Sequence, residues 1–189
     1  MDQEAVLDLY RTSGALLEGH FKLSSGLHSN RYLQSALVLQ FPEFATALGH
    51  ALGAKNSHLQ PTAVLSPALG GIVIGQEVGR GLGVRALYAE RVDGVLTLRR
   101  GFTLSDADRV LIVEDVITTG GSTLETARAA EAAGAHVVGA AAIVDRGADA
   151  ATLGLPLQSL VKLDVQSWPP DQCPLCAKGE PITKPGSRA

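Results

Sequence analysis

The stretch VLIVEDVITTGGSTLE, residues 110–125, joins an apolar segment to a polar one through a turn rich in Thr and Gly. It predicts a strand at 109–113, a loop at 114–121 and a helix at 122–133, with Ser122-x-x-Glu125 as a capping box. The first turn of a helix presents unpaired N–H groups and the positive end of a dipole. Gly120 and Gly121 allow the backbone to approach an anion closely. The stretch therefore predicts a phosphate cradle.

Two adjacent carboxylates, Glu114 and Asp115, precede this cradle, and the hydroxyls of Thr118, Thr119 and Ser122 add donors to it. Carboxylates repel a phosphate, but they suit ribose hydroxyls or a magnesium ion shared with a diphosphate. The combination predicts a sugar phosphate with vicinal hydroxyls as ligand. The alternative is an ordinary strand-to-helix turn with two solvated acids.

Apolar segments expected to be strands alternate with helical ones on both sides of this stretch. We expect strands at 63–65, 85–89, 109–113, 135–144 and 157–163, and helices at 42–53, 72–82 and 122–133. Such alternation favours a parallel sheet covered on both faces, which binds ligands beyond the carboxyl ends of its strands. Loops 66–71, 114–121 and 145–149 are the expected ligand loops, and Asp93-Gly94 predicts a hairpin.

The two ends of the chain give weaker patterns. Val6, Leu9, Tyr10, Ser13, Leu16 and Leu17 recur at helical spacing. Residues 20–34 are interpreted as a loop that enters a strand near 31–37. From Trp168 onward Pro and polar residues dominate, which predicts a loosely folded tail.

Composition excludes several classes of protein. Of 189 residues, 46% are hydrophobic and 19% are charged, which excludes intrinsic disorder. A net charge of −3 and 4% aromatic residues give neither a basic field nor stacking platforms for nucleic acid. Neither a signal peptide nor an apolar run of membrane-spanning length is found. Two cysteines cannot build a disulfide framework, so we expect a cytoplasmic protein.

Several segments resemble one known family. VLIVEDVITTGGST resembles the signature of type I phosphoribosyltransferases, which bind phosphoribosyl pyrophosphate (PRPP). FKLSSGLHS, residues 21–29, resembles the N-terminal segment of orotate phosphoribosyltransferases. Residues 66–71 resemble the family's second phosphate-contacting loop, and 142–146 a strand end with a substrate-binding arginine.

This resemblance covers roughly residues 5–165 and implies a fold. It implies the α/β type I phosphoribosyltransferase fold, a mostly parallel central sheet flanked by helices with a small N-terminal hood. We expect the domain at 1–168, its hood at about 1–40, and a Pro-rich tail with the CPLC sequence at 169–189.

The resemblance also implies a reaction and its residues. An enzyme of this family transfers the phosphoribosyl group of PRPP to orotate, giving orotidine 5′-monophosphate and pyrophosphate in pyrimidine synthesis. Its PRPP-binding residues correspond here to Glu114, Asp115, Val116, Ile117, Thr118, Thr119, Gly120, Gly121 and Ser122. The orotate-binding residues correspond to Thr118, Arg146 and Ser24, and the catalytic ones to Glu114, Asp115 and Arg91. The family uses Mg²⁺ held mainly through the diphosphate rather than by protein ligands, and is typically homodimeric.

The chain departs from the family at several cations. Ser24 and Gly70 stand where many orotate enzymes carry Lys. The mobile loop before the signature, 90–100 here, contains Arg91, Arg99 and Arg100 but neither Lys nor His. Two other functions stay open: transfer to a purine or another base, and regulation by sensing PRPP. For Arg146, the alternative is a surface ion pair with Asp145 or Asp149.

The cysteines, Cys173 and Cys176, form a C-P-L-C sequence that looks like half of a zinc knuckle. Tetrahedral zinc takes four ligands and one chain offers two cysteines here, so two chains could complete a site. Reduced thiols or a labile local disulfide are the alternative. The five histidines (His20, His28, His50, His58 and His136) show no paired ligand spacing and are expected at the surface or as caps, with His28 as the foremost exception.

Overall fold

The computed structural model describes residues 1–23, 25–148 and 150–185. The helices are α1 (Gln3–Thr12), α2 (Ser35–Leu39), α3 (Pro42–Asn56), α4 (Gly70–Leu82), α5 (Gly121–Ala132), α6 (Ala150–Leu153) and α7 (Pro174–Ala177), with 3₁₀ turns at Ser57–Leu59 and Pro170–Gln172. The strands are β1 (Leu16–Lys22), β2 (His28–Leu33), β3 (Ala63–Pro67), β4 (Arg85–Val92), β5 (Val95–Leu98), β6 (Arg109–Ile117), β7 (His136–Asp145), β8 (Leu157–Lys162) and β9 (Ser167–Trp168). No described helix combines the length and apolar character that crossing a membrane requires.

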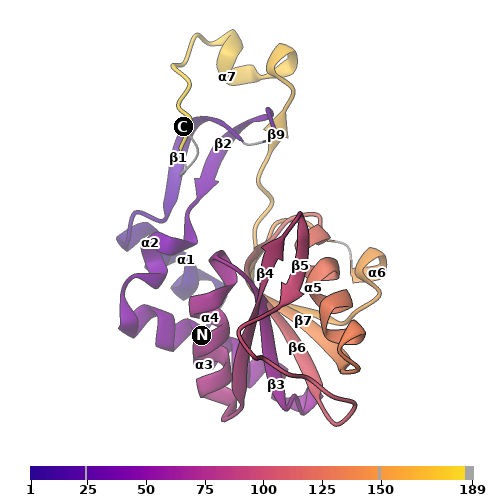
Figure 1. The fold of residues 1–189 in the computed structure, drawn as a ribbon. Helices are drawn as coiled ribbons and strands as arrows, with labels where there is room; N and C mark the ends of the chain where they lie inside the picture. Colours follow the sequence, from indigo (N-terminus) through magenta and orange to yellow (C-terminus); the bar gives the residue numbers. More distant parts are fainter. Residues whose placement is uncertain (24, 149, 186–189) are drawn as a thin grey trace.

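The larger sheet has the order β5-β4-β3-β6-β7-β8 in the described part of the chain. Only the β4–β5 hairpin, at the predicted Asp93-Gly94 turn, is antiparallel; the other neighbours pair in parallel. β3, β6 and β7 therefore all end at one edge of this sheet, which lies between α3 and α4 on one side and α5 on the other (Figure 1). This confirms the mostly parallel α/β sheet with flanking helices.

Alternate residues of the buried strands pack on opposite faces of this sheet, as the period of two requires. On one face, Leu111 and Val113 pack with residues of α1, α3 and α4. On the other, Val110 and Ile112 pack with residues of α5. The core is thus two apolar layers around β3, β6 and β7, and the strand ends stay free to position loops.

The N-terminal region differs from the prediction. α1 ends at Thr12, Gly14 takes φ +68°, and Leu16 begins a strand rather than extending the helix. β1 and β2 form an antiparallel hairpin, and residues 35–37, expected within a strand, belong to helix α2. The helical spacing of Leu16 misled because this residue packs against the main core from the first position of a strand.

The tail is not loosely folded in its described residues. β9 pairs with β2, and the Thr183 N–H donates to the His20 carbonyl at 2.9 Å. In Figure 1 the β1–β2 hairpin projects away from the large sheet, and the yellow tail with α7 lies across its far end. The tail therefore forms one structural unit with the hairpin, although more than a hundred residues separate them in sequence.

Candidate active site

Glu114 and Asp115 lie near the carboxyl end of a strand rather than in the predicted loop, because β6 continues to Ile117. Glu114 is buried and accepts hydrogen bonds from Ser122 at 2.7 Å and Thr123 at 2.9 Å. Both donors belong to the first turn of α5. The strand end and the helix start are thereby tied together, which holds the connecting turn 118–120 in place.

The turn predicted to be a phosphate cradle lacks the predicted capping box. Gly120 is the N-cap of α5 with φ +79°, and no side chain caps the helix. Ser122 bonds to Glu114 instead, and Glu125 forms an ion pair with Arg91 at 2.8 Å. Thr118 and Thr119 are exposed, so their hydroxyls are available to a ligand at the helix N-terminus.

Burial acts on both carboxylates. It raises the pKa of Glu114, and the hydrogen bonds from Ser122 and Thr123 oppose that shift. Burial likewise raises the pKa of Asp115, opposed by hydrogen bonds from the Val116 N–H and the Ser35 hydroxyl. Neighbouring carboxylates whose pKa is raised in this way are common at functional sites.

The loop from β3 to α4 comes close to Asp115. A Cβ placed on Gly70 would lie 2.9 Å from the Asp115 Oδ1, and one on Gly71 would lie 3.0 Å from the Val113 carbonyl. Asp115 and Gly70 also line a cavity of about 370 Å³ together with α2 residues. Any side chain at position 70 would therefore collide with the carboxylate in this arrangement, and the glycine leaves that space open.

Arg146 directly follows the last residue of β7, the strand next to β6. Ile117 and Asp145 are register partners, and the Arg146 N–H donates to the Ile117 carbonyl at 2.8 Å. Its guanidinium Nε is buried without a hydrogen-bond partner in the described residues, and burial lowers the pKa of Arg146. The side chain lines a cavity of about 460 Å³ that also contains Lys162.

The alternative reading of Arg146 as a surface ion pair finds no support from Asp145. The Asp145 Oδ1 accepts the N–H groups of Gly147 at 3.0 Å and Ala148 at 2.8 Å. Asp149, the other proposed partner, lies outside the described residues, as does Ser24, which was expected to bind orotate.

The arginines of the 90–100 segment are engaged within the chain. Besides Glu125, Arg91 donates to the Gly94 carbonyl. Arg100 bonds Glu90 through two nitrogens at 2.7 and 2.8 Å. Arg99 follows the last residue of β5, in the turn after the hairpin. The structure thus places Arg91 beside α5, one turn beyond the cradle, and does not bring it into the cradle itself.

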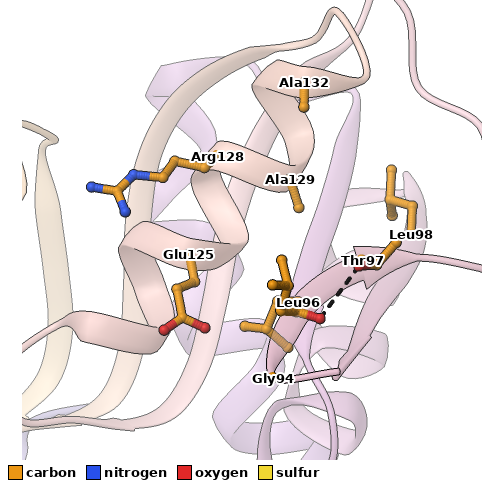
Figure 2. Close-up of a pocket in the computed structure, with 9 residues that line it drawn as sticks. Gly94, Leu96, Thr97, Leu98, Glu125, Arg128, Ala129 and Ala132 are labelled. Carbon is orange, nitrogen blue, oxygen red and sulfur yellow. Dashed lines mark hydrogen bonds between the residues drawn. The ribbon is translucent and has the colours of Figure 1, made fainter. Parts of the chain in front are cut away.

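A larger cavity of about 570 Å³ lies elsewhere, between β5 and α5. Figure 2 shows Leu96, Leu98, Ala129 and Ala132 around it, with Glu125 and Arg128 at one side. Its mostly apolar lining does not suit a phosphate, so size alone does not identify the site here.

Two residues that the sequence did not indicate, Ser35 and Leu153, contact the carboxyl end of β6 and the turn that follows it. Ser35, on α2, bonds Asp115 and lies 3.0 Å from the buried Tyr10 hydroxyl. Leu153, on α6, packs against Gly120, where an added Cβ would lie 2.3 Å from its Cδ2. Neither residue carries a local signal, because each contact joins segments at least 25 positions apart.

Comparisons with known proteins agree with this geometry. Residues 36–153 match the phosphoribosyl transferase domain family. Orotate phosphoribosyltransferases from Chlorobium phaeobacteroides (strain BS1) and Heliobacterium modesticaldum are 51% and 49% identical to the whole chain, over 98% and 100% of their own lengths. The crystal structure of orotate phosphoribosyltransferase from Aeropyrum pernix superposes with a TM-score of 0.71 at 26% identity, covering 84% of this chain and 93% of that one. The chain therefore belongs to the phosphoribosyl transferase domain family and, within it, to the orotate phosphoribosyltransferases.

Proposed function

We propose that this protein transfers the 5-phosphoribosyl group of PRPP to orotate, releasing orotidine 5′-monophosphate and pyrophosphate in pyrimidine biosynthesis. One observation carries the proposal. The cradle at 118–121 and Arg146 leave adjacent parallel strands at the same edge of the sheet, joined by the 2.8 Å bond between Arg146 and Ile117. A proposed anion site and a half-buried guanidinium, whose Nε has no hydrogen-bond partner among the described residues, therefore lie side by side, as a sugar phosphate and an acidic base require.

The cradle would hold the 5-phosphate of PRPP. The first turn of α5, which includes Ser122, supplies N–H groups and the positive end of its dipole, and the exposed Thr118 and Thr119 supply hydroxyls. Glu114 and Asp115 then face the ribose, where ionised carboxylates accept hydrogen bonds from the two ring hydroxyls. This supports the assignment of residues 114–122 as the PRPP-binding segment.

Arg146 would bind the base. Orotate carries a carboxylate and two ring carbonyls, all of them acceptors, and a guanidinium presents donors in a planar fork. The buried Nε of Arg146 gains a partner when an acceptor enters the adjoining cavity. The exposed Thr118 hydroxyl lies on the cradle side, so it suits a contact at the junction of base and ribose.

The reaction needs no nucleophile from the protein. A ring nitrogen of orotate attacks the anomeric carbon, a C–N bond forms, and the C–O bond to pyrophosphate breaks with its electron pair leaving on oxygen. Positive charge builds on the ribose in the transition state. The carboxylates of Glu114 and Asp115 stabilise that charge, and the protein's contribution is positioning and electrostatics.

Magnesium is the expected cofactor, and the residues at the cradle fit it. Mg²⁺ keeps several waters and is usually bound by one or two carboxylates together with substrate phosphates. In the described part of the cradle, Glu114 and Asp115 are the available carboxylates, and no cluster of three or more metal-binding groups lies there. The diphosphate would hold the ion, which neutralises charge on the leaving group. Arg91 would assist after exchanging Glu125 for the departing pyrophosphate.

The assembly and location follow from the same proposal. We expect a homodimer in which the 90–100 segment of one chain reaches the partner's site, and we expect it in the cytoplasm. Light scattering coupled to size-exclusion chromatography tests the first expectation. Cell fractionation with an antibody to the protein tests the second.

A panel of bases tests the proposed function. Purified protein, PRPP and Mg²⁺ are combined with orotate, adenine, hypoxanthine, guanine or uracil, and loss of each base is followed. We expect orotate to be consumed far faster than the others, with one pyrophosphate formed per base. Faster turnover of a purine would assign the chain to another base. PRPP binding without turnover of any base would favour a regulator that senses PRPP.

A further inference from the structure

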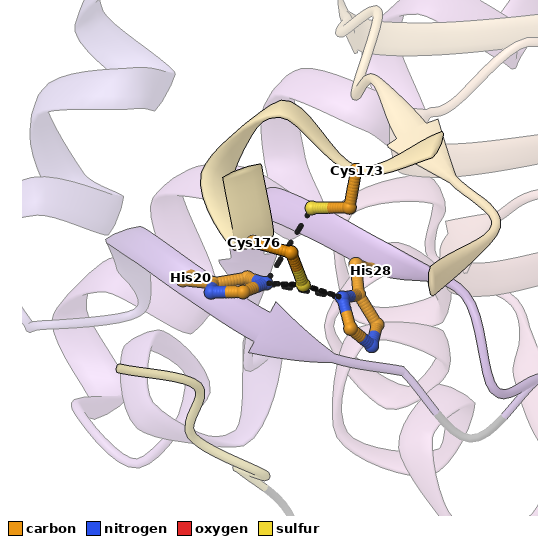
Figure 3. A group of neighbouring side chains, drawn as sticks. All are labelled: His20, His28, Cys173 and Cys176. Atoms are coloured by element: carbon orange, nitrogen blue, oxygen red, sulfur yellow. Dashed lines mark hydrogen bonds between the residues drawn. The ribbon is translucent and has the colours of Figure 1, made fainter. Parts of the chain in front are cut away.

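Four potential metal ligands meet where the tail crosses the hairpin. The ligand atoms of His20, His28, Cys173 and Cys176 all lie within 4.8 Å of one another (Figure 3). Three of these residues are buried, with exposed fractions of 5% for His20, 7% for His28 and 3% for Cys173. We propose that this cluster is a structural zinc site, built entirely within one chain, that fastens the C-terminal tail to the β1–β2 hairpin.

The fold brings these residues together from opposite ends of the chain. His28 pairs with Lys22 across the hairpin, and His20 lies at the irregularity of β1 between Glu18 and Phe21, with its Nε2 3.1 Å from the His28 Nδ1. Cys173 is the N-cap of α7 and Cys176 lies in its first turn, so α7 presents both sulfurs in one direction. The histidines are therefore neither surface residues nor caps, and the site does not need a second chain to complete it.

Four of the six distances between ligand atoms lie within about 0.4 Å of the spacing that tetrahedral zinc requires. Bonds of about 2.3 Å to sulfur and 2.05 Å to nitrogen space tetrahedral ligand atoms about 3.3–3.8 Å apart. Here the His20 Nε2 lies 3.1 Å from the His28 Nδ1, 3.5 Å from the Cys173 Sγ and 3.7 Å from the Cys176 Sγ. The Cys176 Sγ lies 3.2 Å from the His28 Nδ1.

Hydrogen bonds alone account poorly for this packing. The His20 Nδ1 lies 2.8 Å from the Glu180 carbonyl, so it carries the proton and the Nε2 has a lone pair. That single lone pair faces three other polar atoms at once. A cation at the centre satisfies all four. The bond to a backbone carbonyl is also the usual partner of a metal-binding histidine, since it fixes the tautomer and the ring orientation.

The surroundings explain why a metal is useful here. The two hydrophobic clusters of the described chain include no residue from 18–32 and none after 163. The hairpin and tail instead have Phe21 near Tyr32 and a few backbone bonds, among them Lys22 N–H to the Thr183 carbonyl at 2.8 Å. A unit with so little apolar core gains folding free energy from bound zinc.

The donor set identifies both the metal and its role. Two thiolates and two imidazoles in tetrahedral arrangement are typical of zinc. Four protein ligands leave no open position for a water or substrate, so the ion is structural rather than catalytic. The site is separate from the cradle and does not depend on the proposed function.

Metal analysis of the full-length protein tests the proposal. Untagged protein is purified under reducing conditions without chelator, and zinc is measured by mass spectrometry. We expect about one zinc per chain, and its loss in Cys173→Ser/Cys176→Ser, His20→Ala and His28→Ala. The exposed His58→Ala and His136→Ala serve as controls and should keep it. Replacement by Co²⁺ should give the visible absorption of a tetrahedral site and a thiolate charge-transfer band.

Two further measurements keep the test decisive if a variant folds poorly. His28→Cys retains a ligand atom of similar reach and should retain the metal that His28→Ala loses. Chelator should lower the melting temperature of wild type but not of the double Cys variant. Protein that takes up no zinc on reconstitution, or a Cys173–Cys176 disulfide in freshly reduced samples, would overturn the proposal. Zinc retained by both histidine variants would also overturn it, in favour of a cysteine-only site between chains.

Discussion

Replacing Arg146 with Ala tests the assignment of the base-binding side chain. The guanidinium lines a cavity beside the cradle, and its Nε is buried without a partner in the described residues. A hydrogen bond to a charged group contributes about 1.5–3 kcal/mol. At about 1.4 kcal/mol per tenfold, Arg146→Ala should weaken orotate binding by roughly 10- to 100-fold. Lys should rescue poorly, because a point charge does not reproduce the planar fork.

The same geometry predicts what should not change. The PRPP cradle is built by a different loop, so PRPP affinity measured by calorimetry should stay within about twofold of wild type. The melting temperature should be unchanged or higher, since the substitution removes a charge that burial already disfavours. The assay is orotate KM and kcat alongside these two measurements, with the exposed Arg11→Ala as the matched control. Unchanged orotate kinetics, or equal weakening of both substrates with a lower melting temperature, would refute the reasoning.

Three further predictions concern the cradle. Gly120→Ala should weaken PRPP binding and destabilise the fold by about 1–2 kcal/mol, because φ is +79° at this residue and the new Cβ meets Leu153. Adding Leu153→Ala should partly restore the melting temperature. An unchanged PRPP affinity in Gly120→Ala would contradict the proposed cradle. Burial raises the pKa of Glu114, so the native state binds that proton more tightly than the unfolded chain and stability falls as pH rises from the ordinary to the raised pKa. Glu114→Gln should therefore keep or raise the melting temperature at neutral pH, and a lower melting temperature would show that the Glu114 charge is stabilising. The same variant should lower kcat by about tenfold or more, because it removes the charge proposed to stabilise the transition state. Arg91→Ala should lower kcat more than it raises orotate KM. If the 90–100 segment acts across a dimer, mixing this variant with Asp115→Asn should restore activity. Absence of recovery after verified subunit exchange would place each site within one chain.

Local pattern was sufficient for the parallel sheet and for the cradle. Residues 63–65 and 110–113 are buried between two layers of helices, so each forms an uninterrupted apolar run, and both lie in strands that begin where predicted. The strand predicted at 85–89 also begins where expected, although only alternate residues of it are buried. The Gly120-Gly121 turn carries its own signal, because the φ of +79° at Gly120 strongly favours a residue without a Cβ. Both features depend on residues that are neighbours in sequence.

Other features depended on contacts between distant segments. The capping box was wrong because Glu114, eight residues upstream, accepts the Ser122 hydroxyl that would have capped the helix. The N-terminal hairpin was missed because its pairing partners include β9, at the other end of the chain. Leu16 adopts a strand conformation despite its helical spacing, because it pairs with Leu33 of β2.

The sequence by itself therefore determined the sheet, the glycine turn at 120–121 and the family, since each is encoded within a short run of residues. Only the tertiary structure decided which groups share a site. It set Arg146 beside the cradle through the pairing of β6 with β7, and it gathered His20 and His28 with Cys173 and Cys176. The physical reason is that each side chain's chemistry can be read from its position in the sequence, whereas which side chains lie close together depends on how the whole chain folds. His28 and Cys173 are 145 positions apart in sequence, and only folding brings their ligand atoms together.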